Sequence, residues 1–270
     1  MVKNKVLIIR FSSFGDIVQC SAVVELIRLK FNAPAQIHWA TRSEFESLVI
    51  LNQQIDKVLP LNKKLGVLGL LKYGLSLRNE NYTHVYDAHN NLRSKVIKIF
   101  LVTRISPPKF ITRSKDRLKR IFLFGFRINI FPKHFIGIDS YLLPLTKWGI
   151  VKSSSPQLVE WKFSEDVNKK IEAIKIEKFE SSKLIALVPS AAWEMKRWPI
   201  GHWKVLIATL PTAHFVVLGG KEDLFCQELM DIDPARVLNL AGKLSLIESC
   251  KLVSIADLVI SADTGLLHVA

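Results

Sequence analysis

The sequence twice alternates short, continuously apolar runs with longer segments whose apolar residues recur at helical spacing. The first run, residues 5–10, is followed by a turn and then by helically spaced apolar positions over residues 17–31. A continuous apolar run is typical of a parallel strand covered on both faces, and the spaced pattern is typical of an amphipathic helix. Their repeated alternation predicts an α/β fold with doubly wound parallel sheets.

The alternation restarts in the second half, after a Ser- and Pro-containing stretch at residues 151–156 that is typical of a linker. At 270 residues the chain is long enough for two domains, which we expect at residues 1–152 and 153–270. The predicted strands span residues 5–10, 35–40, 57–60, 83–87, 184–188, 214–218, 237–240 and 257–260. The predicted helices span residues 17–31, 44–52, 65–78, 94–101, 139–148, 164–179, 202–210, 222–230 and 245–255, and a last one begins after residue 263.

Two stretches fit this alternation less well. Residues 102–135 mix prolines, cations and aromatic residues, and they predict only some helix. Pro144 lies inside the helix predicted at residues 139–148, where its missing N–H and its ring interrupt helical hydrogen bonding.

The positive charge of the chain is concentrated. The formal net charge is +14, and residues 109–120, the basic segment, carry six cations against one acid. Such a segment attracts phosphates, acidic sugars or anionic lipid head groups. With Lys63 and Lys64, it is expected to lie at an anionic membrane surface; a solvated helix face is the alternative. The apolar residues expected to turn inward are Phe110, Ile111, Leu118 and Ile121.

Other sequence features indicate in which compartment the protein is found and whether it crosses a membrane. Three cysteines, odd in number and far apart, predict neither a disulfide framework nor a metal site and favour a reducing cytosol. His84 and His89 do not share a helical face, so no metal pair is expected. No run reaches the roughly 18 apolar residues that a spanning helix needs, and the first residues turn charged too soon for a signal peptide. The protein is expected to touch a membrane without crossing it.

The last predicted strand leads into Asp263, Thr264 and Gly265, with His268 in the first turn of the helix expected to follow. A helix that begins after a strand presents backbone N–H groups without partners. Gly265 has no Cβ to keep an anion away, and Thr264 adds a hydroxyl donor. These features favour a binding site for a diphosphate. The alternative is that Asp or Thr is an ordinary N-cap residue of the helix.

Three other turns between strands and helices carry charged residues. Asp16 is either an acid favoured by the helix dipole or a general base facing the crevice beyond the strand end. Lys196, between Trp193 and Trp198, either neutralises a phosphate or remains a solvated lysine. Glu222 either accepts two ribose hydroxyls or begins a helix. The turn before Asp16 lacks the glycines of a dinucleotide fingerprint, so no hydride-transfer cofactor is expected.

Taken in order, these turns form a set of motifs that resembles a known family, the ADP-heptose:lipopolysaccharide heptosyltransferases of glycosyltransferase family nine. The matching segments are residues 6–16, 86–94, 189–199 followed by His202 and Trp203, and 263–268, with weaker support from residues 241–246 and 256–260.

The resemblance implies a GT-B architecture of two Rossmann-like domains, with the acceptor bound by the first and the nucleotide sugar by the second. It implies an inverting transfer that requires no cofactor and no metal, with Asp16 as the base. The residues expected to bind the donor are Ser190, Lys196, Glu222, Leu244, Asp263, Thr264, Gly265 and His268. The residues expected to bind the acceptor are Ser13, Lys64, Asn90, Arg93 and Arg120.

The donor is expected to be ADP-heptose and the acceptor an acidic lipopolysaccharide core. We expect a monomer in the cytoplasm, peripheral on the cytoplasmic face of the inner membrane of a Gram-negative bacterium. Family members continue past the segment that matches residues 263–268, so the second domain is expected to be incomplete, and an inactive truncated remnant is one alternative. A basic non-catalytic protein that binds nucleic acid or membrane is the other. The ordered motifs favour the enzyme, with no nucleic-acid partner.

Overall fold

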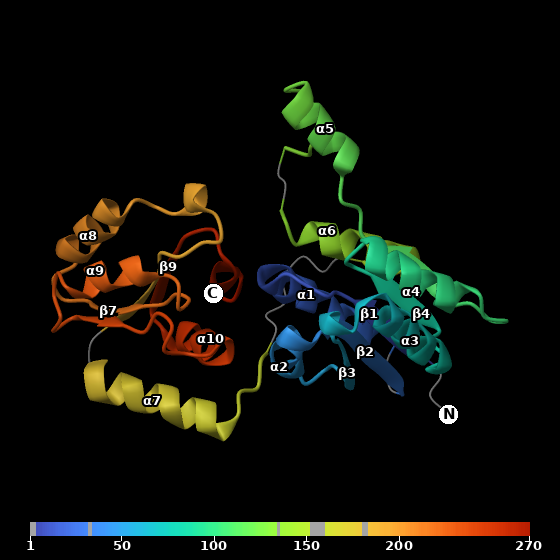
Figure 1. The fold of residues 1–270 in the computed structure, drawn as a ribbon, viewed down its shortest axis with the longest axis horizontal. Helices are drawn as coiled ribbons and strands as arrows, with labels where there is room; N and C mark the ends of the chain where they lie inside the picture. The colour runs from blue at the N-terminus through green and yellow to red at the C-terminus, as the bar shows by residue number, and fades with distance from the viewer. Residues whose placement is uncertain (1–3, 32–33, 134–135, 152–159, 180–182) are drawn as a thin grey trace. The chain divides into compact units, whose positions relative to one another are not determined.

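In the computed structural model, residues 4–31, 34–133, 136–151, 160–179 and 183–270 are described. The chain forms two compact units, Met1–Trp161 and Lys162–Ala270, called here the first and second unit. Each unit is built on its own parallel sheet with helices packed against it (Figure 1). The α/β class predicted from the alternation is confirmed.

The sheet of the first unit has the strand order β3-β2-β1-β4-β5, all parallel. Its strands are β1 (Asn4–Ile9), β2 (Ala35–Arg42), β3 (Lys57–Leu61), β4 (His84–Asp87) and β5 (Lys109–Thr112). The chain winds outward from β1 to β3 and then returns to β4 on the other side of β1. The sheet therefore has a switch point between β1 and β4, where ligands of such folds bind beyond the carboxyl ends of the strands.

Helices cover both faces of this sheet. The helices of the unit are α1 (Phe14–Phe31), α2 (Glu46–Ile50), α3 (Gly66–Asn79), α4 (Leu92–Val102), α5 (Arg117–Gly125) and α6 (Asp139–Leu142), with 3-10 turns η1 (Ser43–Phe45), η2 (Lys63–Leu65) and η3 (Leu143–Trp148). Helix α5 has no buried residue and does not cover the sheet. Figure 1 shows α3 and α4 side by side on one face, where Leu77 and Ile97 pack against Ile9 and Val85. Because side chains alternate along a strand, Tyr86 points to the opposite face and donates a hydrogen bond to the backbone of α6.

The second unit repeats the design with the strand order β8-β7-β6-β9 and a switch point between β6 and β9. Its strands are β6 (Leu184–Val188), β7 (His214–Val217), β8 (Val237–Asn239) and β9 (Leu258–Ser261). Its helices are α7 (Glu165–Phe179), α8 (Ile200–Thr209), α9 (Gln227–Met230) and α10 (Leu246–Ile255), with 3-10 turns η4 (Glu194–Lys196), η5 (Leu224–Cys226) and η6 (Gly265–His268). Helix α10 begins with a reciprocal capping box between Ser245 and Glu248.

Several predicted elements were wrong in type or extent. The helix predicted at residues 222–230 begins only at Leu224, as a 3-10 turn, because Asp223 turns its side chain back onto the preceding loop. The helix expected after residue 263 is the single turn η6. The segment at 139–148 changes type just before Pro144, because α6 ends at Leu142 and η3 begins at Leu143. Strand β5 was missed because an edge strand that exposes Lys109 and half-exposes Phe110 has no continuous apolar run.

The orientation expected for the basic segment was only half right. Ile111 is buried on β5 and Phe110 is half-buried, as expected. Leu118 and Ile121 are instead 72% and 55% exposed. They lie on a different element, α5, which contributes no buried residue. Among the described residues, no helix combines the length and the apolar character that a membrane crossing requires.

Candidate functional site

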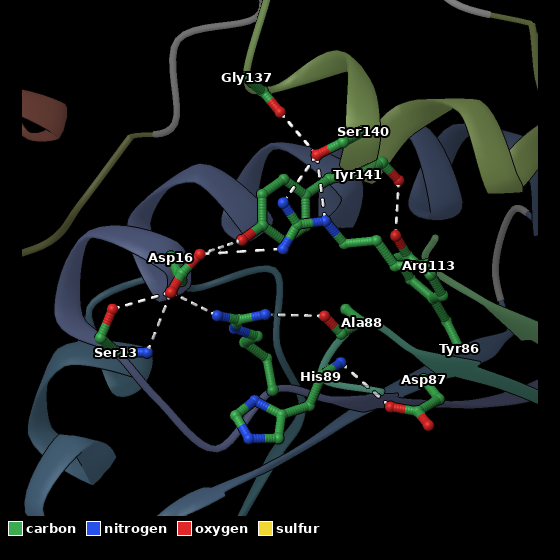
Figure 2. A network of polar contacts seen from close by, with 11 residues as sticks. Ser13, Asp16, Tyr86, Asp87, Ala88, His89, Arg113, Gly137, Ser140 and Tyr141 are labelled. Carbon is green, nitrogen blue, oxygen red and sulfur yellow. Dashed lines mark hydrogen bonds and ion pairs between the residues drawn. The ribbon is translucent and has the colours of Figure 1, made fainter. Parts of the chain in front are cut away.

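Asp16 lies at the switch point of the first sheet, in the first turn of α1 and just beyond the end of β1. Both of its carboxylate oxygens are held by donors (Figure 2). Oδ2 lies 2.5 Å from Nη2 of Arg10 and accepts hydrogen bonds from the Ser13 hydroxyl at 2.8 Å and the Ser13 backbone N–H at 3.3 Å. Oδ1 accepts a hydrogen bond of 2.6 Å from the Tyr141 hydroxyl. The carboxylate therefore has a defined orientation.

Arg10 joins the two strands that flank the switch point. It follows β1 directly and is only 5% exposed. While Nη2 pairs with Asp16, Nη1 donates a 2.8 Å hydrogen bond to the carbonyl of Ala88, just after β4. A cation this deeply buried needs such partners, because an unpaired buried charge is strongly destabilising.

Arg113 approaches the same carboxylate from the end of β5. Its Nη1 lies 3.8 Å from Oδ1 of Asp16, and its Nε and Nη2 both donate to the Ser140 hydroxyl, at 3.0 and 2.8 Å. The guanidinium stacks on the Tyr141 ring, 3.6 Å from the centroid, which is a cation–π contact. The Asn90 side chain donates to the backbone carbonyl of Arg113 at 2.8 Å, so it positions the arginine through the main chain.

The turn after β4 is shaped by Asp87. One of its carboxylate oxygens accepts the backbone N–H groups of His89 and Asn90, at 3.0 and 2.7 Å, and the other accepts the Ser94 hydroxyl at 2.7 Å. Asn90 has φ of +48°, a left-handed conformation that Asn tolerates. Asp87 is buried and fully engaged, so its role is to build the turn that carries Ala88 and His89.

The charge states of the site follow from these contacts. Burial alone would raise the pKa of Asp16, but the Arg10 charge and the hydrogen bonds from Tyr141 and Ser13 outweigh it, and the pKa lies below its usual value. Burial lowers the pKa of His89 to about 4, with further lowering by Arg10 and Lys115. At neutral pH the site therefore presents an ionised carboxylate beside a neutral imidazole.

A cavity of about 280 Å³, here called the basic cavity, opens beside Asp16. Four cationic residues and two acidic ones line it, which leaves an excess of positive charge. Burial and the nearby charges of Arg10 and Arg117 also lower the pKa of one of these cations, Lys115. An anionic group of a ligand would relieve this repulsion. The lining residues are Arg10, Arg113, Lys115, Arg120, Asp16, Asp116, His89, Ser114, Phe131 and Ser140.

The second unit carries a charged pair at its own switch point. Lys196, at the end of η4 in the loop after β6, lies 2.5 Å from Oδ2 of Asp263, which follows β9. The side chains are 46% and 60% exposed. An exposed ion pair contributes about 0–1 kcal/mol to stability, so it holds these groups loosely and leaves the lysine accessible to an anion.

Asp223 organises the loop behind this pair. It is buried and accepts the Ser190 hydroxyl at 2.5 Å and the backbone N–H of Gly220 at 2.7 Å. Arg197 lies 3.5 Å from its other oxygen and also donates to the carbonyl of Ala191 at 3.0 Å. The proton of Ser190 is thus directed at Asp223, and a bound phosphate would have to compete for it.

The remaining residues expected at the donor side lie on three loops. Glu222 is exposed in the turn after β7, not in a helix, and Leu244 is half-buried in the turn before α10. Gly265 and His268 belong to η6. Thr264 occupies the N-cap position of that turn, but its side chain makes no capping bond, and Asp263 pairs with Lys196 instead. The alternative of ordinary side-chain capping at this position was therefore wrong.

Of the residues expected to bind the acceptor, Ser13 contacts Asp16, Arg120 lines the basic cavity and Asn90 holds Arg113. Lys64 in η2 and Arg93 in α4 are exposed and do not line the cavity. Sequence reasoning missed five residues that shape the two sites. A signal was available for Arg10, a cation that ends an apolar strand, and for Arg113, which lies in the basic segment, but not for the others. They are Arg10, Arg113, Tyr141, Arg197 and Asp223.

Two parallel α/β units in tandem, each with charged groups at the switch point of its sheet, have the architecture of the GT-B fold. The profile of glycosyltransferase family 9 (heptosyltransferase) matches residues 70–270, and the chain belongs to that family. The resemblance noted in the sequence, the GT-B fold and the enzyme class are confirmed.

Similar proteins support this assignment. The lipopolysaccharide heptosyltransferase 1 of Campylobacter coli is 28% identical over an alignment of 285 positions, gaps included. The alignment covers 98% of this chain and 80% of that protein. Three solved structures share the fold at lower identity. The E. coli ADP-heptose lps heptosyltransferase II has a TM-score of 0.75 and 20% identity, and the match covers 98% of this chain and 81% of that chain. The E. coli heptosyltransferase WaaC with ADP has a TM-score of 0.70 and 20% identity, with 98% of this chain and 83% of that chain covered. A family 9 glycosyl transferase from Veillonella parvula has a TM-score of 0.79 and 18% identity, with 100% of this chain and 78% of that chain covered.

Proposed function

We propose that this glycosyltransferase transfers a heptose from ADP-heptose to the inner core of lipopolysaccharide, with inversion at the anomeric carbon. The observation that carries the proposal is an ionised, oriented Asp16 beside the basic cavity, in a chain of the heptosyltransferase family. The similar E. coli enzyme with bound ADP-2-deoxy-2-fluoro heptose and the name of the Campylobacter relative support the choice of donor and acceptor.

In this proposal the first unit binds the acceptor. Arg113, Lys115 and Arg120 hold the acidic groups of the core sugars in the basic cavity, and charge-assisted hydrogen bonds give these contacts their strength. The attacking hydroxyl loses its proton to Asp16 as its oxygen forms the bond to the anomeric carbon. Because Asp16 is a weak base, that proton moves late, when the hydroxyl has already become acidic.

The second unit binds the donor. Lys196 exchanges Asp263 for the diphosphate and neutralises the negative charge that develops on ADP as the bond to the sugar breaks. Ser190 and the turn from Thr264 to Gly265 hold the same diphosphate. Glu222, His268 and Leu244 complete the donor set, at the ribose, the sugar and the adenine respectively.

The direct experiment incubates the protein with ADP-heptose and a lipopolysaccharide core acceptor that lacks heptose. Mass spectrometry is expected to show one heptose added to the acceptor and release of ADP. ADP-glucose with the same acceptor is the control and should transfer far less. Bound ADP-heptose without any gain in acceptor mass would contradict the proposed reaction.

We also propose that α5 rests on the anionic cytoplasmic leaflet of the inner membrane. Leu118, Ile121 and Phe124 are 72%, 55% and 78% exposed on this helix, and Arg117 and Arg120 are exposed beside them. A cationic helix with an exposed apolar side fits an interface between lipid head groups and acyl chains. Each cation near an anionic surface contributes about 1 kcal/mol. The exposed apolar side chains of α5 would thus face lipid, not the protein.

Co-sedimentation with vesicles of phosphatidylglycerol and phosphatidylethanolamine tests this contact. The protein is expected to bind, to be released by salt, and to bind several-fold less when Arg117 and Lys119 become Glu or when Leu118 and Phe124 become Ser. Lys72→Glu, an exposed charge reversal on α3, is the control and should bind as the unchanged protein does. Equal binding to neutral vesicles, or none at all, would rule the contact out.

A further inference from the structure

The two oxygens of Asp16 are not equivalent. Within the part of the chain that the structure describes, Oδ2 has three donors, two groups of Ser13 and one of Arg10. Oδ1 accepts one hydrogen bond, from Tyr141, and Arg113 at 3.8 Å is beyond hydrogen-bond distance. Each carboxylate oxygen offers about two lone-pair sites, so the contacts made by the described residues leave one site open on Oδ1 and none on Oδ2. The open site belongs to a side chain that is 36% exposed and lines the basic cavity.

We propose that Oδ1 is the oxygen that takes the acceptor proton, and that Tyr141 is a positioning residue that orients Oδ1 and keeps Asp16 ionised. This inference rests on the proposed role of Asp16 as the base. In the transfer, the acceptor O–H bond breaks, its proton goes to Oδ1, and the oxygen's electron pair forms the bond to the anomeric carbon. ADP leaves with the electrons of the bond that breaks.

The side chain of Tyr141 is held in a fixed position by its surroundings. Its ring is fully buried, Arg113 stacks on one face, and its backbone carbonyl accepts the hydroxyl of Tyr86 at 2.7 Å. Burial raises the pKa of Tyr141, and Asp16 adds to that effect against Arg10. The hydroxyl therefore stays protonated and can only donate to the carboxylate. A fixed donor of this kind stabilises the charged form of Asp16.

Other groups also face this carboxylate and must stay constant in a test. Arg10 reaches it from the end of β1 and Arg113 from the end of β5, and Cys20 lies one turn along α1. The remaining titratable groups of the cavity are His89, Lys115, Asp116 and Arg120. Removing only the Tyr141 hydroxyl leaves all of them in place.

The experiment compares Tyr141→Phe with the unchanged protein over a range of pH. Loss of the donor is expected to raise the pKa of Asp16, so the acidic limb of kcat/KM should move up by about one pH unit. Above that limb, kcat should fall about tenfold with little change in either KM, because the base is less well oriented. Carbon-13 NMR titration of the Asp16 carboxyl measures the same shift without substrates. Replacing Tyr141 by 3-fluorotyrosine, a stronger donor, should move the titration to lower pH.

Tyr73→Phe is the matched control, because it removes a tyrosine hydroxyl of the same unit that donates to the Leu59 carbonyl and contacts neither Tyr141 nor Asp16. Its acidic limb should stay in place even if the protein is less stable. An unchanged Asp16 titration in Tyr141→Phe, or an equal shift in Tyr73→Phe, would overturn the inference and leave the base proposal standing. Full activity of Asp16→Asn would instead refute the base itself, and the NMR titration would then report only a structural contact.

Discussion

Asp16→Asn is expected to lower turnover by about 10²–10⁴-fold, the range typical for loss of a general base. Asparagine keeps the shape and one oxygen of the side chain, but it cannot take a proton at neutral pH. Arg10 loses its counter-ion and keeps the Ala88 carbonyl and the Tyr141 ring as partners, so the free energy of unfolding should also fall, by about 1–3 kcal/mol. Affinity for ADP should not change, because the residues proposed to bind the donor belong to the second unit.

Steady-state kinetics, calorimetric titration with ADP and thermal unfolding separate these effects. Asp116→Asn is the control, since it also removes a carboxylate from the lining of the basic cavity. Asp116 has φ of +45°, which Asn tolerates, and it pairs with Lys119, not with Asp16. Its turnover should change by less than about tenfold. A lower melting temperature of Asp16→Asn with turnover intact would mean that Asp16 only supports the helix start.

Lys196→Gln is expected to lower turnover by about 10²–10³-fold, a loss typical for one group that stabilises developing charge. The same change should weaken ADP binding, because the diphosphate loses its cationic partner. The melting temperature should hardly move, since the pair with Asp263 is exposed and such pairs contribute about 0–1 kcal/mol. This combination distinguishes a binding lysine from one that supports the fold.

Lys204→Gln is a close match for this test. Lys204 lies in the same unit, pairs with Glu228 at 2.9 Å and is 40% exposed, against 46% for Lys196. It has no proposed role with the donor, so its removal should leave both turnover and ADP affinity unchanged. Equal losses in the two variants would show that the effect comes from surface charge in general, and the assignment of Lys196 would fail.

Local sequence was sufficient for most elements because the groups involved are close along the chain. The apolar strand that becomes β1, the helical spacing of α1 and the Ser245 cap of α10 all depend on neighbouring residues. The missed strand β5 marks the limit of such reasoning. Its Phe110 and Ile111 are held by pairing with β4, and that pairing does not depend on an apolar pattern of its own.

The sequence by itself determined the alternation of elements, the excess of positive charge and the turns on which Asp16 and Lys196 lie. Only the tertiary structure decided their partners. Tyr141 is 125 positions from Asp16, and Asp263 is 67 positions from Lys196. Parallel strands joined by crossover helices bring such distant turns to one edge of a sheet. The charge state of Asp16 depends on those distant partners, because burial and opposing charge act through space and not along the chain.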